Sequence, residues 1–368
     1  MAGAIYFAMT HSEPGGLREI WNDAAAGLAA RGHPVRRFVL YPNRDTVQRD
    51  AAAKEGWHHV LAARPSGLVG NIRLFVALVR YLRQERPRAV VTAMPLANVL
   101  MPLAVRVAGT RTRVYVSHHS PADTHNPLLA RLDRWTGGMR EVSAIISVSD
   151  AVARSLDGAP AAYRAKRVTI HNALPESVEQ AIDRLVAVAR PKAVGRIVAM
   201  GRLSYQKNYP MLLRAMAQVP AGTLDIIGGG EDEAALRALT LELGITDRVR
   251  FLGQMTRQQA LTHAATAQAF AQVSHYEGHS LALVEAARLG LPLVVSAVPV
   301  QMEGITSPSG EHCGIAVPIG DDTALATALN RLLADEADRE HWANLARSLG
   351  LTASHAAMID AYERLVAG

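Results

Sequence analysis

Short apolar runs rich in branched side chains alternate along the chain with longer stretches in which apolar residues recur every three or four positions. The short runs predict strands that are covered on both faces, and the longer stretches predict amphipathic helices. The predicted strands are residues 4–9, 35–41, 89–93, 113–117, 144–148 and 168–170 in the first half, and residues 197–201, 224–227, 249–252, 269–273, 293–296 and 315–317 in the second half. Helices are predicted between them, for example over residues 16–31, 71–84, 127–138 and 150–156.

The order of these elements predicts an α/β protein with two doubly wound, Rossmann-like parallel-sheet domains. The alternation restarts after Pro191, Lys192 and Gly195 interrupt a helical pattern, which argues against a single eight-fold barrel. We therefore expect a first domain over residues 1–175, a linker over 176–194, a second domain over 195–350, and a C-terminal helix within 351–368 that returns to the first domain. Such sheets bind ligands at the carboxyl ends of their strands, so the expected site is the cleft between the two domains.

Composition places the chain among ordinary globular proteins. Of its 368 residues, 49% are hydrophobic and 20% are charged, which excludes a disordered, collagen-like or coiled-coil protein. No apolar run approaches the roughly 18–20 residues that span a bilayer, and no basic residue precedes the first apolar stretch as in a signal peptide. Cys313 is the only cysteine, so we expect no internal disulfide, no cysteine-ligated zinc and a cytoplasmic location.

The net charge of +6 is unevenly distributed. Residues 1–190 contain 25 Lys and Arg against 15 Asp and Glu, whereas residues 191–368 contain 14 against 18. A basic first half favours an anionic partner, and an acidic lipid surface, an anionic acceptor and nucleic acid are the candidates. Nucleic acid ranks last, because no stacking motif or recognition helix is visible. Residues 71–83 are apolar on more than one face, which predicts a buried helix, with peripheral docking on the inner face of an anionic membrane as the alternative.

Two loops that follow predicted strands carry candidate anion-binding groups. Gly15 and Gly16 lie between the first strand and the first helix, where glycine lets backbone N–H groups approach a bound anion; the alternative is a tight turn without a ligand. In the second half, Arg202 and Lys207 lie five residues apart in one loop. A guanidinium and an ammonium at that spacing can converge on one diphosphate, and the alternative is two solvated surface cations.

The segment HYEGHSLALVEA at residues 275–286 combines two carboxylates with a predicted helix N-terminus. Ser280 is the expected N-cap, which places Glu277 in the preceding loop and Glu285 inside the helix, roughly 7–8 Å further along. The two carboxylates can hold hydroxyl groups on either side of a phosphate docked at the helix N-terminus. Alternatively, Glu285 pairs with a neighbouring arginine, because a buried carboxylate needs a partner.

Five ordered segments of the second half resemble the nucleotide-sugar-binding domain of retaining GT-B glycosyltransferases, specifically glycosyltransferase family 4. They are GRLSYQKN, DIIGGGEDEAALRAL, DRVRFLGQM, HYEGHSLALVEAARLGLPLVVSAVPVQMEGI and HCGIAVPIGDDTALATAL. Glu277 and Glu285 match the family's Glu-x7-Glu pair, and the resemblance covers nearly all of residues 195–335. In the first half, the Gly-Gly loop, GLAARGHPV, His118 after VYVS, ISVSDAVARSL and VTIHNALP resemble the family's acceptor domain more loosely.

The resemblance implies a GT-B enzyme that transfers a sugar without a metal and with retention of configuration. The implied donor is a UDP-linked hexose or N-acetylhexosamine, and the implied acceptor is a glycan or a lipid-linked glycan in surface polysaccharide synthesis. Arg202 and Lys207 would neutralise the donor diphosphate, Glu277 would bind the transferred sugar, Glu285 would hold the ribose, and His118 would reach the sugar from the first domain. The implied donor-binding residues are Gly15, Gly16, His119, Gly228, Gly229, Leu252, Gly278, His279, Ser280, Leu281 and Glu285.

Three departures from the family pattern limit what can be transferred. His279 and Ser280 stand where the family usually has Phe-Gly, which leaves the donor sugar open. The first domain ends in Asn-Ala-Leu-Pro rather than Asn-Gly-Val-Asp, and VPVQMEG replaces a usual Gly-Gly before Glu303. No Asp-x-Asp metal clamp is present, and His275 with His279 straddles a predicted loop, so we expect no metal cofactor.

Two other functions remain open at this point. A nucleotide-sugar epimerase of the same architecture would isomerise a donor without any acceptor. A catalytically inactive partner protein would keep the fold and bind the donor without turnover, although the intact Arg/Lys and Glu/Glu pairs argue against it. The expected partners are a nucleotide-sugar donor and a glycan or lipid-linked acceptor, with no nucleic acid.

Overall fold

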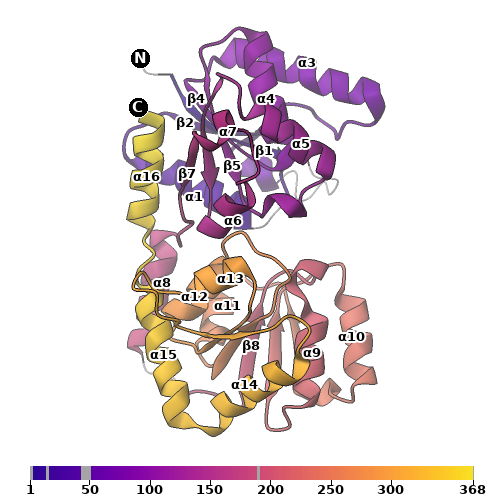
Figure 1. Ribbon diagram of the computed structural model, residues 1–368, viewed down its shortest axis with the longest axis vertical. Helices are drawn as coiled ribbons and strands as arrows, with labels where there is room; N and C mark the ends of the chain where they lie inside the picture. The colour runs from indigo at the N-terminus through magenta and orange to yellow at the C-terminus, as the bar shows by residue number, and fades with distance from the viewer. Residues whose placement is uncertain (1–2, 14–15, 43–50, 189–190, 368) are drawn as a thin grey trace. The chain divides into compact units, whose positions relative to one another are not determined.

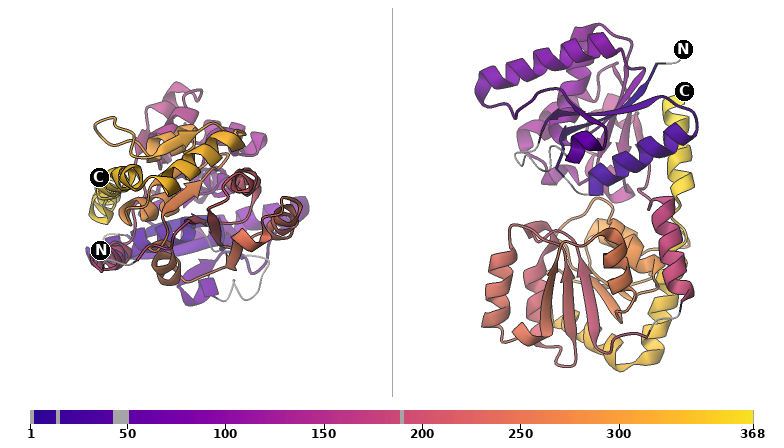
Figure 2. Two further views of the ribbon diagram at one scale, coloured as in Figure 1. Left: turned by 90° about the horizontal axis from the view of Figure 1, so that it is seen from below. Right: turned by 180° about the vertical axis from the view of Figure 1, so that it is seen from behind.

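The computed structural model describes residues 3–13, 16–42, 51–188 and 191–367. The chain divides into two compact units, Met1–Asn172 with Ala356–Gly368, and Ala173–His355. Each unit consists of a parallel sheet with helices on both faces (Figures 1 and 2). The predicted fold class of two doubly wound parallel-sheet domains is therefore confirmed. None of the helices in the described part of the chain combines the length and the apolar character that crossing a bilayer requires.

The first unit contains a seven-stranded sheet in the order β3-β2-β1-β4-β5-β6-β7. Its strands are β1 (Ile5–His11), β2 (Val35–Tyr41), β3 (Trp57–His59), β4 (Ala89–Ala93), β5 (Arg113–His118), β6 (Val142–Ser147) and β7 (Arg167–Thr169). Its helices are α1 (Gly16–Ala30), α3 (Gly67–Glu85), α4 (Pro95–Ala108), α5 (Pro127–Thr136), α6 (Asp150–Ser155), α7 (Ala161–Arg164) and α16 (His355–Ala367), with a 3₁₀ turn, η1, at Ala122–Thr124. The sequence predicts six strands here and misses β3, because this edge strand buries only Trp57 and has no apolar run.

The C-terminal helix α16 packs on the first unit. Tyr362 is fully buried, and its ring lies 6.2 Å from the rings of both Phe7 on β1 and Trp21 on α1. A Cβ atom at Gly27 of α1 would come within 2.6 Å of Ile359, so the absence of a side chain there lets the two helices approach closely. The segment after residue 355 thus completes the core of a sheet whose other elements lie more than 180 residues earlier in the chain.

The second unit contains a six-stranded sheet in the order β10-β9-β8-β11-β12-β13. Its strands are β8 (Arg196–Met200), β9 (Thr223–Ile227), β10 (Val249–Gly253), β11 (Ala269–Gln272), β12 (Leu293–Ser296) and β13 (Ile315–Val317). Its helices are α8 (Glu176–Ala187), α9 (Tyr209–Ala217), α10 (Glu233–Glu242), α11 (Arg257–Ala264), α12 (Leu281–Arg288), α13 (Pro299–Gly304), α14 (Asp322–Ala334) and α15 (Glu336–Gly350), with 3₁₀ turns η2 (Tyr205–Lys207) and η3 (Thr246–Arg248).

Helix α8 falls within the segment expected as a linker, residues 176–194, and it packs in the second unit. Ile182 is fully buried in the same cluster as residues of β8 and β11. Asp183 binds Arg288 of α12 through two hydrogen bonds, with Nε–Oδ1 and Nη2–Oδ2 distances of 3.1 and 2.8 Å. The amphipathic pattern of this segment therefore belongs to a core helix, because its apolar stripe has a surface to cover.

Candidate functional site

The sheet order of the second unit brings two loops together. The first strand, β8, lies in the interior of the sheet between β9 and β11, so the chain runs outward in opposite directions from this point. In doubly wound sheets, ligands bind at the carboxyl ends of the strands at such a topological switch point. The loop after β8 holds Arg202 and Lys207, and the loop after β11 holds Glu277. Both sequence-predicted loops therefore lie at the carboxyl-terminal edge of this sheet, next to each other.

Glu277 and Lys207 bind each other directly. The carboxylate is only 6% exposed, and its Oε1 atom lies 2.7 Å from Lys207 Nζ. Ser274 Oγ and Gln272 Nε2 also donate to Oε1, at 2.7 and 3.0 Å, and Gln206 Nε2 donates to Oε2 at 3.2 Å. Four donors compensate the cost of burying this charge. The sequence assigns the two residues to different parts of a donor and does not foresee this pair.

Backbone geometry explains how Lys207 reaches the end of β11. Gly201 has a φ of +151°, and a Cβ atom there would lie 2.8 Å from Lys207 Cε. Asn208, with a φ of +50°, donates from Nδ2 to the carbonyl of Val273 at 3.1 Å. The amide of His275 donates to the carbonyl of Gln206 at 2.8 Å. The two loops are thus joined through their backbones, and the glycine leaves room for the lysine chain.

The glycines after β9 pack against the same loop. A Cβ atom at Gly228 would lie 2.0 Å from the carbonyl oxygen of Gly201, which only glycine allows. The amide of Leu203 donates to the carbonyl of Gly229 at 3.1 Å, and the amide of Gly228 donates to the carbonyl of Gly253 at 2.9 Å. Leu252, predicted to frame a nucleotide, is half-buried against the core. Close backbone packing accounts for glycine at position 228, and the predicted contact of Gly228 and Gly229 with a donor stays a prediction.

Arg202 lies in the same loop but has a different partner from Lys207. Its Nε atom is 3.0 Å from Glu231 Oε2, and the two side chains are 66% and 56% exposed. The arginine is therefore solvated and free to change its rotamer at little cost. The predicted convergence of Arg202 and Lys207 on one diphosphate stays a prediction, because in this structure each cation binds a separate carboxylate.

The N-terminus of α12 is joined to Glu277 through Gln272. Ser280 caps the helix as predicted, since its Oγ accepts from the amide of Leu283 at 3.3 Å. The same hydroxyl donates to Gln272 Oε1 at 2.8 Å, while Gln272 Nε2 donates to Glu277. The motifs of the sequence do not single out Gln272, although a polar residue at the end of a buried strand is a usable signal. Gly278 is buried, and His279, Ser280 and Leu281 are partly exposed at the helix start.

Glu285 pairs with an arginine, which is the alternative that the sequence left open. The residue is 8% exposed, and its Oε1 atom lies 3.0 Å from Nε of Arg257. Arg257 occupies the first position of α11, where Thr256 and Gln259 form a capping box. This pair neutralises the buried carboxylate without any ligand. The role of Glu285 in holding a ribose stays a prediction.

In the first unit, His118 ends β5 in a buried polar cluster. Only 2% of the residue is exposed, and Nε2 lies 2.8 Å from the hydroxyl oxygen of Tyr163. Tyr163 donates its proton to Asp133 Oδ2 at 2.8 Å, so Nε2 of the histidine carries the proton shared with the hydroxyl oxygen. Burial, followed by the charge of Asp133, raises the pKa of Tyr163 above its usual value. Of the two readings that the sequence leaves open, the surface histidine is wrong, because the side chain is buried, and the predicted contact of His118 with a donor sugar stays a prediction.

The remaining first-unit predictions have different outcomes. His119 accepts or donates at Nε2 with Ser117 Oγ at 3.0 Å, and burial followed by His118 lowers its pKa to about 3. Gly16 begins α1, and a Cβ atom there would meet nothing within 4 Å, so the fold itself does not require glycine. Gly15 lies outside the described residues. Met94, between β4 and α4, has a φ of +77°, which marks a strained position at this sheet's own switch point that the sequence analysis missed.

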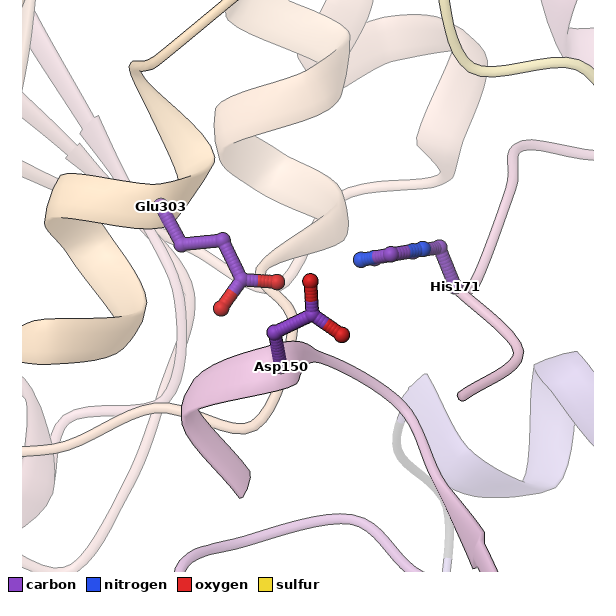
Figure 3. Close-up of side chains that lie close together, drawn as sticks. All are labelled: Asp150, His171 and Glu303. Atoms are coloured by element: carbon purple, nitrogen blue, oxygen red, sulfur yellow. The ribbon is translucent and has the colours of Figure 1, made fainter. Parts of the chain in front are cut away.

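Three further side chains of metal-ligating type are labelled in Figure 3. Asp150 begins α6 and His171 follows β7, and both belong to the first unit, where one potential ligand atom of each lies within 4.8 Å of the other. Glu303 lies on α13 of the second unit. Within the first unit this is a pair of ligand atoms, fewer than the three protein ligands typical of a catalytic zinc site. The expectation that no metal is needed stays a prediction.

Known proteins resemble both halves of the chain. Residues 187–349 match the family model described as glycosyl transferases group 1, and residues 14–177 match the model of glycosyltransferase family 4. The crystal structure of HepE from Anabaena in complex with UDP-glucose has a TM-score of 0.80 and 19% sequence identity, covering 99% of both chains. The chain belongs to the GT-B glycosyltransferases of family 4. The predicted family and the GT-B fold of this family 4 protein are thereby confirmed.

Two curated relatives align with parts of this family 4 protein. The lipopolysaccharide core biosynthesis glycosyltransferase LpsD of Rhizobium meliloti is 34% identical over 167 residues, which are 45% of this chain and 47% of LpsD. The D-inositol 3-phosphate glycosyltransferase of Mycobacteroides abscessus is 29% identical over 276 residues, 68% of this chain and 60% of that protein. The chain therefore spans about half the length of the curated relatives it matches.

Proposed function

We propose that this protein transfers a sugar from a UDP-linked donor to a glycan or lipid-linked acceptor, with retention of configuration and without a metal. The Lys207–Glu277 pair at the switch point of the second unit, beside the capped N-terminus of α12, carries the proposal. A fixed cation next to a helix N-terminus is suited to a diphosphate. The adjacent carboxylate is suited to sugar hydroxyl groups.

Each charged group has a part in this proposal. Lys207 has three N–H donors, one of which is directed to Glu277, so the others can bind the leaving phosphate without breaking the pair. Arg202 turns from Glu231 to the same diphosphate, which its solvated position allows. Glu277 accepts from the transferred sugar, and Glu285 accepts from the ribose while Arg257 holds its other side. These cations stabilise the charge that develops on the leaving group.

The proposed reaction exchanges one bond to the anomeric carbon for another on the same face. The bond between that carbon and the phosphate oxygen breaks, and the acceptor hydroxyl oxygen forms the new bond. The acceptor proton passes to the departing phosphate, so atoms and charge balance without a further reactant. No enzyme nucleophile takes part. Cationic side chains and backbone N–H groups near the phosphates replace the metal that other transferases use.

The acceptor proposal rests on the printed functions of relatives and on the charge of the first half. LpsD acts in lipopolysaccharide core biosynthesis, which supports a surface polysaccharide or its lipid-linked precursor as the acceptor here. Helix α3 adds a possible route to such an acceptor. One stripe of α3 is buried, as the sequence predicts, but Leu68, Val69 and Ile72 are exposed at its N-terminal half. Exposed apolar residues beside Arg73 and Arg80 suit an anionic bilayer surface.

Ligand-induced thermal stabilisation tests donor binding directly. A ligand at 100 times its Kd stabilises the folded state by about 2.7 kcal/mol, which raises the melting temperature. Because the proposed donor is UDP-linked, UDP should raise the melting temperature more than GDP or ADP at the same concentration. Arg202→Gln should reduce the shift, whereas Arg131→Gln on the exposed face of α5 should preserve it. The absence of any nucleotide-dependent shift would contradict the proposal.

Product analysis then separates transfer from the other reactions. NMR of the product should show the anomeric configuration of the donor, with a rate that EDTA does not reduce. Isomerisation of the donor in the absence of acceptor would instead identify an epimerase, and an inverted product would exclude the front-face route. For α3, Ile72→Ser should weaken sedimentation with phosphatidylglycerol vesicles, and equal recovery with neutral and acidic vesicles would contradict membrane docking.

A further inference from the structure

The first unit has an arginine-lined hollow at the amino-terminal edge of its sheet, which we name the arginine pocket. Its volume is about 710 Å³, and its lining residues are Gly3, Arg83, Arg86, Pro87, Arg88, Ala108, Gly109, Thr110, Arg111 and Thr112. They come from the C-terminal ends of α3 and α4 and from the segments that precede β1, β4 and β5. His118 lies at the opposite, carboxyl-terminal end of β5. The arginine pocket is thus remote from the first-unit residues of the proposed reaction.

Four guanidinium groups line this pocket, and no carboxylate is among the lining residues. The acidic residue nearest to them in the sequence, Glu85, lies between Arg83 and Arg86 but is engaged elsewhere. Its Oε2 atom accepts from the Tyr6 hydroxyl at 2.6 Å and from Arg36 Nη1 at 2.7 Å. The positive charges around the pocket therefore lack a lining counter-ion within the described part of the chain, and their mutual repulsion is relieved by a bound anion.

Helix capping accounts for part of this cluster. Arg83 donates to the carbonyls of Val107 and Ala108 at the end of α4, at 2.9 and 3.3 Å, and Arg86 donates to the carbonyl of Arg83 at 3.3 Å. Cations favour helix C-termini, so these contacts are expected. Carbonyl partners are neutral, however, and leave the charge of both guanidinium groups in place.

The other two arginines are not explained by capping. Nε of Arg88 is buried and lacks a hydrogen-bond partner among the residues that the structure describes. Arg111 is exposed in the turn between α4 and β5. The arginines that line the hollow thus come from two separate segments, residues 83–88 and the turn before β5. An arrangement of this kind binds an anion with several acceptor oxygens, because each fork can take two of them.

We infer that the arginine pocket binds an anion with at least two phosphoryl groups, either a soluble polyphosphate or clustered phosphate headgroups of a lipid. Four positive charges exceed what one phosphate neutralises. The volume lies within the range of small-molecule sites, which is roughly 300–1,000 Å³. Planar guanidinium forks match phosphate oxygens in pairs, whereas no aromatic side chain is among the lining residues to stack against a base. This inference concerns a second anion site and does not depend on the proposed transfer reaction.

Isothermal titration of the full chain with sodium tripolyphosphate tests the soluble form. Arg86→Gln and Arg111→Gln should each weaken binding by about tenfold or more, since a hydrogen bond to a charged group contributes about 1.5–3 kcal/mol. Arg131→Gln removes the same charge from an exposed position of α5 and should leave the affinity unchanged. Citrate, a carboxylate trianion, should bind at least about tenfold more weakly than tripolyphosphate if phosphoryl groups are the ligand.

A second set of measurements separates this site from the proposed donor site. The double variant Arg86→Gln/Arg111→Gln should lose tripolyphosphate binding at the arginine pocket, whereas Arg202→Gln should keep it. The two sites are therefore tested independently, and a negative result for one does not affect the test of the other. Vesicles of phosphatidic acid in phosphatidylcholine test the headgroup form with the same variants. If the double variant has a lower melting temperature than the unchanged protein, the single variant Arg111→Gln replaces it in these measurements, because this exposed side chain does not support the core.

The outcomes are decisive in both directions. If the protein binds tripolyphosphate and the pocket variants abolish that binding, the ligand is a soluble polyphosphate. If the protein binds only the vesicles and the pocket variants abolish that binding, the ligand is a lipid headgroup. Binding to neither probe, binding that the pocket variants leave unchanged, or equal affinity for citrate would overturn the inference.

Discussion

Replacing Lys207 should destabilise the fold and replacing Arg202 should not, although the proposed function requires both. Lys207→Met removes the ammonium that lies 2.7 Å from Glu277, a carboxylate that is 6% exposed. Arg202→Gln removes a cation from a pair whose members are 66% and 56% exposed. We therefore expect Lys207→Met to destabilise the fold, and Arg202→Gln to leave it unchanged while both abolish transfer.

The expected magnitudes follow from the two environments. Removing one member of a buried ion pair costs about 3–5 kcal/mol, because the remaining charge is left without compensation. Ser274, Gln272 and Gln206 still donate to Glu277, so the lower end, about 3 kcal/mol, applies to Lys207→Met. Exposed ion pairs contribute about 0–1 kcal/mol, which sets the limit for Arg202→Gln.

Urea denaturation of the second unit's transition, followed by circular dichroism, measures both changes. A linear extrapolation with an unchanged m-value gives the difference in unfolding free energy. The double variant Lys207→Met/Glu277→Gln completes a thermodynamic cycle, and it should recover a large part of the loss because the unpaired charge is gone. Equal losses for Lys207→Met and Arg202→Gln, or no recovery in the double variant, would refute the reasoning about this pair.

Three further predictions concern packing, titration and the buried network. Gly350→Ala should lower the free energy of unfolding by roughly 1–3 kcal/mol, because its methyl group would lie 2.4 Å from the backbone nitrogen of Arg288 where α15 crosses α12. Gly158→Ala is the control, since its methyl group would meet nothing within 4 Å. Equal urea midpoints for the two variants would contradict the prediction. Burial, followed by His118, lowers the pKa of His119 to about 3, so only the unfolded chain takes up this proton below pH 6.5, and stability falls by up to about 1.4 kcal/mol per pH unit between pH 6.5 and 4.5. His119→Gln should flatten that pH dependence of the melting temperature, and an unchanged slope would contradict the assignment. Tyr163→Phe should cost about 1–3 kcal/mol by thermal denaturation, because His118 and Asp133 both lose a buried partner, and a change below about 0.5 kcal/mol would show that water replaces the hydroxyl.

The strand pattern could be predicted because buried parallel strands are continuous apolar runs. Four of the twelve predicted strands, residues 35–41, 89–93, 293–296 and 315–317, coincide with β2, β4, β12 and β13. The edge strand β3 could not be predicted, since its sequence, Trp-His-His, follows no strand pattern and its pairing with β2 and its side-chain contacts, such as that of Trp57 with Asn22, depend on the fold. Hydrophobic periodicity reports burial along one run, so it gives no signal for a three-residue strand with a single buried side chain.

The loops of the candidate site were predictable, but their pairings were not. Sequence spacing places Lys207 and Glu277 after two different strands, and only the order β9-β8-β11 makes those strands neighbours. The same limitation applies to Glu285, whose partner Arg257 lies 28 residues earlier at the start of another helix. A motif specifies which residue types serve a chemistry, whereas the partner of each depends on sheet order.

The charge of the first half shows the same limit more sharply. Counting residues predicts an anionic partner for this half, but the count cannot say where the charges gather. Arg83, Arg88 and Arg111 approach one hollow only because β4 lies next to β5 and because α3 and α4 both end at the same edge of the sheet. Had the sheet order been different, the same composition would give scattered surface cations. Composition therefore predicts only that this half has an anionic partner, whereas the place where its charges gather follows from topology.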